Sequence, residues 1–525
     1  MLKITARDRE TLLEPLFRAG PGFYVLALAL LVVVGWGALV YVRQIVVGLA
    51  VTGMQRPAYW GVYMVNFIFF IGISHAGTLI SAILRVTNAE WRRPITRIAE
   101  AITVFALVVG TLQILFDMGR PERLLYVFIF GRLQSPLLWD AVSVTTYFLG
   151  SVFYLYLPLI PDAAVLRDNL PRTAPPWRSR LYHLLALGWR GNRTQWVRLE
   201  RIITIMAVLI IPIAISVHTI ISWILATTVQ PGWHSTVFGP YFVVGAIFSG
   251  IGALFIAMTI MRRIYHLEAY ITEKQYHYLG YLLIAMTAIW FYFTSAEHLI
   301  LAAGQQEAEF PVLASKLWGE YAPDFWIMVT LMGIAFWVLV FPGLVSGRWG
   351  GAPIFQRRFT MAAAVSTATA IALAFLPQTQ PITTGMGNIS GRALLLAVAL
   401  VFAMASAISV LPWLKQHVVA RTVIASVCVV VGMWLERWSI IVSTITHPRL
   451  IPWSSYVPTA TEWSLTAASL ALFALLFMLF FKIFPPVAVW EVAEGRAIEQ
   501  AQAQIEVPLP EPSTVARRRW GIGRS

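Results

Sequence analysis

The sequence predicts an all-α polytopic membrane protein, and three observations carry this prediction. The 525-residue chain is 58% hydrophobic and only 12% charged. Apolar runs of about 20 residues recur along it, which is the length that a helix needs to cross a bilayer. Lysine and arginine gather in alternate loops between these runs, as the positive-inside rule describes for membrane proteins.

The apolar runs predict about twelve transmembrane helices, and ten is the alternative count. We place them at residues 23–42, 59–84, 98–116, 137–158, 203–228, 240–261, 279–302, 325–344, 359–377, 393–412, 421–446 and 463–483. The ninth run is short and rich in alanine and threonine, so it is the weakest of the twelve.

The charge distribution predicts that both termini are cytoplasmic. The segments on the N-terminal side of the membrane hold 30 of the 39 Lys and Arg residues, and the opposite loops hold 7. Residues 1–22 then form a cytoplasmic tail, and residues 493–525 form a second one that we expect to be disordered. Because the positive charge lies in loops between spans, the net charge of +14 does not indicate nucleic-acid binding.

Cysteine and histidine usage argues against a redox centre in this chain. A single cysteine, Cys428, excludes an intrachain disulfide, a thiolate-held iron–sulfur cluster and a CxxCH haem site. The sequence has no HExxH motif and no Glu-x-x-His pair, so we expect no metal site. Each predicted span carries at most one histidine, which disfavours a stacked pair of haems.

The run "GMWLERWSII" places Glu436 and Arg437 near the middle of a predicted span. A charge at this depth costs several kcal/mol unless it is paired or faces a cavity. Neighbouring helical positions point about 100° apart, so we expect these two to pair with each other only weakly. Partners are therefore expected on other spans. The candidates are Glu297, Asp140 or Asp117 for Arg437, and His75 or His218 for Glu436.

The ionisable residues of the spans form a staircase that rises toward the outer face. At 1.5 Å per residue, His75 lies about 5 Å inward of the midplane, while His218, Glu436 and Arg437 lie about 4 to 5 Å outward. Asp140 and Glu297 lie about 10 Å outward, with Asp117 at the outer boundary. Such a staircase predicts a proton route or an outward-opening pocket. Plain interhelical hydrogen bonding of His75 and helix capping by Asp140 are the structural alternatives.

Seven motifs in order resemble one family. They are "GISHAGTLISAIL", "DMGRPERL", "SPLLWD", "SVHTIISW", "GWHSTVFGPYFVVGAIFSG", "GMWLERWSIIV" and "YVPTATEWS…FKIFPPVAVWEV". Together they resemble the NrfD/PsrC-like membrane subunits of quinone-linked oxidoreductases, over roughly residues 20–345 and 405–492. The nearest likeness is to the larger quinol-oxidising membrane subunit of bacterial alternative complex III.

The resemblance implies a fold and partners. It implies two four-helix bundles, within residues 23–228 and 229–446, with flanking helices and an outer loop and last helix at 447–492. It also implies a menaquinol or ubiquinol bound as substrate near the outer face of the bacterial inner membrane, and no haem or iron–sulfur cluster in this chain. The implied partners are an iron–sulfur subunit on the outer face, multihaem cytochromes c, a second NrfD-like membrane subunit and lipids.

The resemblance and the chemistry together name candidate site residues. By motif, Asp140, His75, His218 and the Glu436–Arg437 pair match positions that the family associates with the quinol site and proton path. Quinol oxidation needs a base beside the ring hydroxyl, and Asp117, Asp140 and His218 are the candidates for this catalytic role. Trp139 and Trp223, with Tyr147 and Phe238, are candidate walls of the quinol slot beside Arg437. His75, Glu297 and Glu436 are assigned to the proton path.

Three departures from the family pattern stand out. Asp117 occupies a position where the family commonly has histidine. Ile224 or Leu225 replaces an acid expected just after "SVHTIISW", which weakens one proton path. Residues 345–412 resemble an insertion of two spans, and a pair of spans preserves the topology.

Three rival functions remain open. A quinone-reducing subunit of the same superfamily would run electrons inward. A secondary transporter would use the buried charges for coupling, but the spans lack the paired Gly/Pro interruptions typical of such proteins. A purely structural membrane subunit would bind no quinone.

Overall fold

The computed structural model describes residues 5–56, 58–345, 416–450 and 452–496, together with Met361, Val365, 382–384 and 387–389. Within these residues ten helices are long and apolar enough to cross a membrane. They are α3 (Pro21–Val47), α4 (Val62–Val86), α5 (Thr96–Asp117), α7 (Pro136–Asp168), α9 (Arg193–Ala226), α10 (Phe238–Ile264), α11 (Glu273–Gly304), α13 (Ala322–Val345), α17 (Val418–Ile445) and α18 (Ala460–Ile483). Each matches one predicted span. The predicted spans 359–377 and 393–412 lie outside the described residues, apart from Met361 and Val365.

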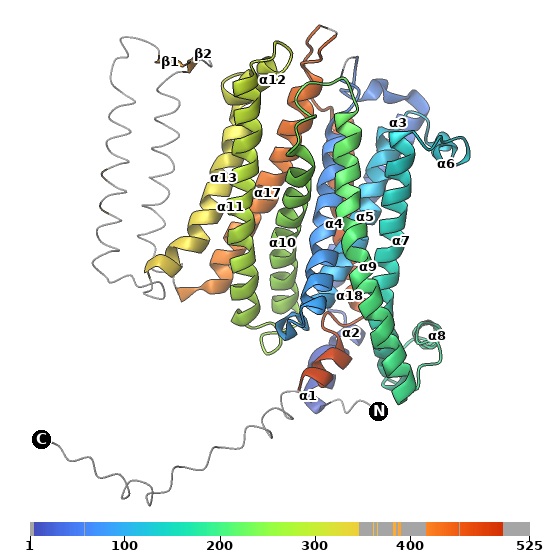
Figure 1. Ribbon diagram of the computed structural model, residues 1–525. Helices are drawn as coiled ribbons and strands as arrows, with labels where there is room; N and C mark the ends of the chain where they lie inside the picture. The colour runs from blue at the N-terminus through green and yellow to red at the C-terminus, as the bar shows by residue number, and fades with distance from the viewer. Residues whose placement is uncertain are drawn as a thin grey trace, which may run out of the picture.

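Short helical elements lie at the two ends of the long helices. They are α1 (Ala6–Asp8), η1 (Arg9–Leu13), α2 (Glu14–Phe17), η2 (Leu49–Val51), η3 (Glu90–Arg92), η4 (Pro121–Arg123), α6 (Tyr126–Ile129), α8 (Pro176–Leu185) and α12 (Phe310–Leu317). Strands β1 (Ile382–Thr384) and β2 (Gly387–Ile389) pair antiparallel. In Figure 1, α12 lies at one end of the bundle and α1, α2 and α8 lie at the other.

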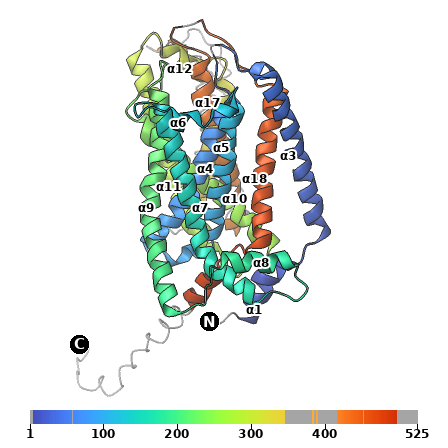
Figure 2. The same ribbon diagram turned by 90° about the vertical axis from the view of Figure 1, so that its right-hand side faces the viewer.

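The long helices form two packed groups. Helices α4, α5, α7 and α9 pack as bundle one, and α10, α11, α13 and α17 pack as bundle two. Helix α4 also packs against α10 and α17, which joins the bundles (Figure 1). Helices α3 and α18 lie side by side at one edge, with α18 against α5 (Figure 2). This arrangement of two four-helix bundles with flanking helices confirms the predicted fold class.

Gly77 allows a close contact between α4 and α5. A Cβ added to Gly77 of α4 would lie 2.0 Å from the Ala99 carbonyl oxygen of α5. Between membrane helices there is little hydrophobic driving force, and small residues that allow close van der Waals packing take its place. Gly77 thereby lets α4 and α5 pack together one half-turn from His75.

Helices α7 and α9 each run well past one end of the span that the sequence predicted. Helix α7 runs on to Asp168 instead of ending near residue 158, and α9 begins at Arg193 instead of near residue 203. Apolar-run criteria stop at the first prolines or charges. In the structure the helices continue past them, and in α7 a side chain of a neighbouring helix binds a backbone carbonyl. Arg97 Nη2 donates to the Pro158 carbonyl at 3.2 Å.

The end of bundle one that the charge distribution predicts to face the cytoplasm, called the inner end below, is closed by the residues that follow α18. Asp162 pairs with Arg97 and accepts hydrogen bonds from the backbone N–H groups of Val489 at 3.2 Å and Trp490 at 3.3 Å. Glu491 lies 2.6 Å from Arg85. Residues 489–496 are helical, so the predicted disordered tail does not begin at 493, and residues 497–525 lie outside the described residues.

The two described ends of the chain meet on one side of the bundle. Arg496 forms an ion pair with Asp8, and α1 lies at the same end as α8 and α2 (Figure 1). The ten long helices of the described residues, an even number, agree with this. Their cytoplasmic location remains a prediction from the positive-inside rule.

Candidate functional site

The two mid-membrane histidines meet in the centre of bundle one. His218 Nδ1 on α9 lies 3.2 Å from His75 Nε2 on α4, and both side chains are fully buried. Their ring centroids are 4.1 Å apart. The heights predicted for the two residues, about 5 Å inward and about 4 to 5 Å outward of the midplane, stay predictions, and they did not indicate that the rings meet. Heights counted from span midpoints assume centred, upright helices, and α9 extends well past the expected inner boundary.

Both ring nitrogens of His75 face carbonyl oxygens. Nδ1 lies 2.7 Å from the Ile71 carbonyl, and Nε2 contacts the Ala214 carbonyl as well as His218. A carbonyl oxygen can only accept, and a neutral imidazole has a single N–H, so the ring donates to both carbonyls only when it holds a second proton. A lasting charge is costly in an apolar bundle. The geometry therefore suits a proton that passes through His75.

Tyr147 and Asp140 lie on the same face of α7, and Tyr147 contacts His75. The Tyr147 ring lies 4.7 Å from the His75 ring, and its hydroxyl donates to the Ser74 carbonyl at 3.0 Å. Asp140 lies seven residues earlier on the same face of α7, about 10 Å further outward along the axis. Its Oδ1 atom is buried and has no hydrogen-bond partner. Tyr147 is fully buried, and its place as a wall of the quinol slot stays a prediction.

A second unpartnered atom lies at the histidine pair. His218 Nε2 is buried without a hydrogen-bond partner. A Cβ built on Gly72 would lie 3.8 Å from this nitrogen and 3.2 Å from Ser249 Oγ, so α4, α9 and α10 converge here. A buried polar atom without a partner is expensive, and it marks a place where water or a ligand group would bind.

Glu436 and Arg437 pair directly with each other. Arg437 Nη1 contacts Glu436 Oε2, and both residues are 1% exposed. The prediction that sequence neighbours would pair only weakly is therefore wrong, because the long arginine side chain folds back to its neighbour. Trp290 Nε1 on α11 donates to Glu436 Oε1 at 2.5 Å and holds the carboxylate in place.

The expected interhelical partners of this pair are not the ones found. Among the described residues, Arg437 makes no ion pair with any acid other than Glu436, and Glu436 makes no hydrogen bond with a histidine. His218 does lie within electrostatic range of Arg437. Which side chains meet depends on the rotation of each helix about its axis, and the sequence does not fix that rotation.

Helix α10 makes room for the guanidinium. The Arg437 Cζ atom lies 5.1 Å from the centroid of the Phe242 ring, a cation–π contact. A Cβ added to Gly245 would lie 2.6 Å from Arg437 Nη2. Arg437 Nη2 itself has no hydrogen-bond partner. The pair thus bridges α10 and α17 with part of its hydrogen-bonding capacity unused.

A small cavity lies beside Glu436 at the outer part of bundle two. It measures about 20 Å³, and its lining includes Glu436, Glu297, His298 and Lys316. This is room for about one water molecule. A pocket for a ring-sized ligand is commonly about 300 to 1,000 Å³, so a quinone ring does not fit here. Phe238, predicted as a wall of the quinol slot, lines this cavity instead.

Three of the predicted residues lie away from these clusters. Asp117 ends α5 within electrostatic range of Glu462 and Tyr63, in a separate group near the outer ends of α3 and α18. Trp139 is 38% exposed and donates to the Leu133 carbonyl at 2.6 Å, and Trp223 is 55% exposed. Both tryptophans therefore face outward from bundle one.

Sequence reasoning missed Trp290 and Lys316. Trp290 carries no sequence signal, because tryptophan in an apolar run is most often a packing residue. Lys316 did carry one, since it is the single Lys or Arg of the predicted outer segment 303–324, which is otherwise acidic. A lone cation among acids at a membrane surface indicates pairing, and the structure buries it at 7% exposure.

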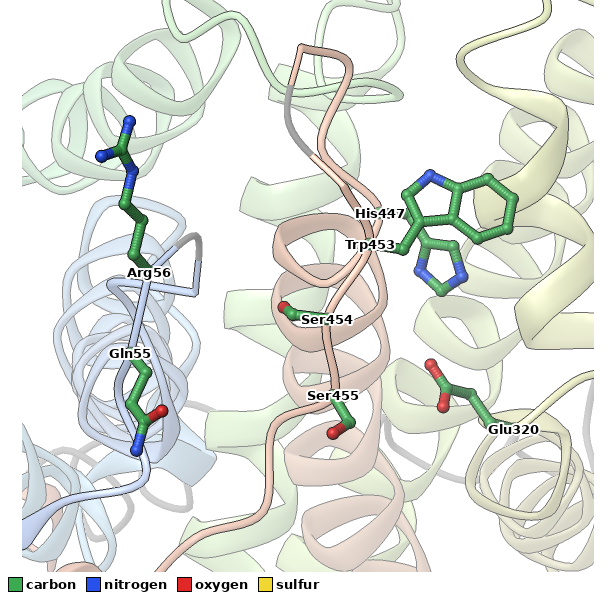
Figure 3. Close-up of a pocket in the computed structure, with 7 residues that line it drawn as sticks. All are labelled: Gln55, Arg56, Glu320, His447, Trp453, Ser454 and Ser455. Carbon is green, nitrogen blue, oxygen red and sulfur yellow. The ribbon is translucent and has the colours of Figure 1, made fainter.

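A large polar hollow opens at the outer end of the molecule. Its volume is about 630 Å³, and it is lined by Gln55, Arg56, Glu320, His447, Trp453, Ser454 and Ser455. Figure 3 shows Gln55 and Arg56 on one side of it, with Glu320, His447 and Trp453 on the other. The rings of His447 and Trp453 lie 4.9 Å apart. Segments distant in sequence thus build one polar depression, here called the outer hollow.

Comparison with known proteins identifies the family that this chain matches. Residues 50–348 match the family model described as "Polysulphide reductase, NrfD". The chain is 31% identical over 239 residues to a putative dimethyl sulfoxide reductase membrane subunit of Halobacterium salinarum, a match that covers 45% of this chain and 51% of the relative. It is 25% identical over 240 residues to a selenate reductase subunit of Mesobacillus selenatarsenatis, covering 43% and 54%.

The name of a third relative includes menaquinol. The chain is 23% identical over 236 residues to an Hdr-like menaquinol oxidoreductase integral membrane subunit of Archaeoglobus fulgidus, covering 44% of this chain and 49% of the relative. The chain spans about half the length of the curated relatives it matches. The family match includes His75, Asp117, Asp140, His218 and Glu297, and the Glu436–Arg437 pair lies beyond it.

Proposed function

Since this chain belongs to the NrfD family of membrane subunits, we propose that it is the quinol-binding subunit of a respiratory oxidoreductase. In this proposal quinol is oxidised near the outer face, and the electrons pass to an iron–sulfur partner. The finer assignment is the larger membrane subunit of alternative complex III, with multihaem cytochromes c and a second NrfD-like subunit in the bacterial inner membrane.

The names of the relatives support the direction of electron flow. Two of them are named as subunits of reductases, and a reductase must be supplied with electrons. The third is named for menaquinol, a two-electron donor of membranes. A membrane subunit that oxidises quinol and feeds a partner fits all three names.

The single observation that carries the proposal is the position of Asp140. Its buried, unpartnered Oδ1 lies at the outer end of α7, between the exposed Trp139 and the buried Tyr147. A carboxylate there lies close to the surface of bundle one, and Tyr147, about two turns further along the same face of α7, contacts His75. Capping of α7 alone would not leave this oxygen without a donor.

The chemistry follows from this placement. Oxidation of a quinol to a quinone releases two electrons and two protons. Asp140 would accept a proton from a ring hydroxyl, as a general base within hydrogen-bond reach. The electrons would leave to an iron–sulfur partner seated over the outer face, where the outer hollow offers polar side chains for docking.

The quinol ring would lie against the outward surface of bundle one. The exposed Trp139 and Trp223 provide aromatic faces there, and the cavity in bundle two is too small for a ring. His218 and His75 lie deep in the bundle, so we assign both to the proton path with Glu297 and Glu436. Asp117 remains a candidate second base in its separate outer cluster.

Quinone reduction is the rival within the same family, because the same groups can deliver protons to a reduced ring. Transport is less well supported. Pro212 lies inside α9, and Pro158 and Pro161 lie inside α7, but these helices continue without a break.

The test uses the intact complex purified through this chain. The expected result is co-purification of iron–sulfur and c-haem partners. Adding menaquinol should reduce these centres, which is measured from their absorption bands. Asp140→Asn should slow this reduction by about 100-fold or more, the usual contribution of a general base. Asp168→Asn, at the exposed inner end of the same helix, is the matched control and should not change the rate.

Two outcomes would contradict the proposal. One is a complex without haem and iron–sulfur partners. The other is an Asp140→Asn complex that oxidises menaquinol as fast as the unaltered one. Reduction of added menaquinone by pre-reduced partners, faster than the forward reaction, would favour the rival direction.

A further inference from the structure

The cavity beside Glu436 is lined by polar atoms that lack partners. Glu297 is 6% exposed, and its Oε1 has no hydrogen-bond partner, while its Oε2 accepts from Ser235 Oγ at 2.5 Å. His298 Nε2, on the next residue of α11, is also buried without a partner. Both residues line the cavity together with Lys316 of α12 and Glu436 of α17. We name this the Lys316 cavity.

The donors and acceptors of the Lys316 cavity match one water molecule. His298 Nδ1 lies 2.7 Å from the Thr294 carbonyl, so Nδ1 carries the proton and Nε2 of the neutral ring is an acceptor. A carboxylate oxygen of Glu297 is a second acceptor, and the Lys316 ammonium is a donor. A water molecule has two protons to give and accepts from a third group. The volume of about 20 Å³ suits one water, with the two to four polar partners that buried waters have.

The cavity also lies between the buried ion pair and the outer surface. Glu436, on its inner side, belongs to the Glu436–Arg437 pair. Beyond Glu297 come Ser235 and then His234, which is 51% exposed and lies 3.0 Å from Glu309. The residues thus form a series from mid-membrane to solvent that is separate from the histidine pair of bundle one.

We propose that the Lys316 cavity holds a single water that relays protons between Glu436 and the outer surface, and that Lys316 positions this water. When Glu436 carries a proton, it gives that proton to the water oxygen, and the water passes one of its own protons to the Glu297 carboxylate. Lys316 keeps its three protons, and no electron moves. That the protons come from quinol rests on the proposed function, whereas the water site itself does not.

The electrostatic surroundings of Lys316 agree with a positioning role. Burial lowers the pKa of Lys316 to about 8, and the nearby carboxylates of Glu297 and Glu436 act in the opposite direction. The other titratable groups around it are His298, on the cavity wall, and Glu309 and His234 beside Glu297. A lysine held among two acids can orient water without needing to transfer its own proton.

The first arm of the test needs no quinone. A cryo-electron microscopy map of the intact complex, at a resolution that shows ordered waters, should contain a density peak within hydrogen-bond distance of Glu297 Oε1 and His298 Nε2. In the Lys316→Met complex this peak should be lost or weakened. An empty cavity in the unaltered complex would overturn the proposal.

The second arm measures proton release outside proteoliposomes during menaquinol oxidation, with a membrane-impermeant pH dye. Lys316→Met should slow release at least tenfold per folded complex, and Lys316→Arg should restore most of the rate. Glu307→Gln, an exposed acid near Glu309, is the matched control and should behave as the unaltered complex.

The outcomes separate the two proposals. If the unaltered complex does not oxidise menaquinol, the proposed function fails, while the density peak still decides the water site. If the peak is present but Lys316→Met releases protons at the normal rate, the relay is overturned. A merely structural Lys316 would lower the yield of folded complex and leave the rate per complex unchanged. Should Lys316→Met not fold, Glu297→Gln makes the same comparison through the acceptor.

Discussion

Two buried arginine–carboxylate pairs of the protein are built differently. Arg97 and Asp162, at the inner end of bundle one, are 1% and 0% exposed. Arg97 also donates to the carbonyls of Pro158 and Pro485, and Asp162 accepts two backbone N–H groups. Arg437 and Glu436, both 1% exposed, lie within bundle two. There Arg437 Nη2 has no partner and a cavity adjoins Glu436.

This difference distinguishes an ion pair that stabilises the fold from an ion pair that can take part in function. Of the Arg97 guanidinium only Nε lacks a partner, and the pair fastens the segment after α18 to α5 and α7. A buried ion pair is tolerated when hydrogen bonds satisfy its remaining atoms. The Arg437 pair leaves a terminal nitrogen free beside Phe242 and Gly245. Polar atoms without hydrogen-bond partners beside a cavity can bind a water molecule or a proton.

The largest expected effect comes from breaking the inner pair. Arg97→Met leaves the Asp162 carboxylate buried and uncompensated, which should cost about 3 to 5 kcal/mol of stability. The measurement is thermal unfolding of the purified chain in detergent. Arg172→Met, in the exposed loop before α8, is the matched control and should unfold like the unaltered protein.

A second variant checks the reasoning on the inner pair. Arg97→Met combined with Asp162→Leu removes both charges and should recover most of the lost stability, because no buried charge is left alone. Equal stability of Arg97→Met and the unaltered chain would mean that the pair does not hold the inner end together.

The next largest effect is expected at the central pair, and it falls mainly on activity. Glu436→Gln removes a proton carrier but keeps the hydrogen bond from Trp290 possible through the amide oxygen. We expect menaquinol-driven proton release to fall at least tenfold, with a smaller loss of thermal stability than for Arg97→Met. The measurements are dye-detected release in proteoliposomes and unfolding in detergent. The proposed difference between the two pairs would be contradicted if Glu436→Gln destabilised the protein as much as Arg97→Met and left proton release unchanged.

The smallest effect is expected for a third pair, at the aqueous end of the molecule. Arg496 and Asp8 join the two described ends of the chain, and Arg496 is 36% exposed. Burial raises the pKa of Asp8, but hydrogen bonds from Arg496, Thr5 and Tyr270 outweigh it and hold the pKa below its usual range. The contribution of such a partly exposed pair is about 1 kcal/mol or less.

The sign of the pH dependence follows from that lowered pKa. The folded Asp8 binds its proton less readily than the unfolded one, so the pair stabilises the protein above pH about 4 and this gain is lost as pH falls further. The stability difference between the unaltered chain and Asp8→Asn should therefore be constant near neutral pH and shrink below about pH 4. A difference that grows on acidification would show that the pair is not the source.

Much of the fold could be predicted because the cost of charge in lipid acts locally. The ten described long helices each match a predicted span. A long apolar run is stable mainly as a helix across the bilayer, because the helix satisfies its backbone hydrogen bonds internally. The same cost identified His75, His218, Glu436 and Arg437 as unusual, and all four are buried near the centre of the structure. Helix ends were predicted less well, because α7 and α9 continue past their apolar runs.

The contacts within the site could not be predicted. His75 was assigned a different height from His218, yet the two rings touch. Arg437 was expected to seek another helix, yet it folds back onto Glu436. That Trp139 and Trp223 are both exposed on bundle one was not evident from the apolar runs.

The sequence by itself therefore determined the number and order of the described spans, their class and which helices carry ionisable groups. Each of these depends on hydrophobicity along one segment. Only the tertiary structure decided that Asp162 faces Arg97, that Lys316 lines a cavity with Glu297, and that the two histidines form a pair. Those contacts depend on the tilt, rotation and relative height of packed helices. Close contacts such as those at Gly77 and Gly245 set these quantities, and no single segment contains them.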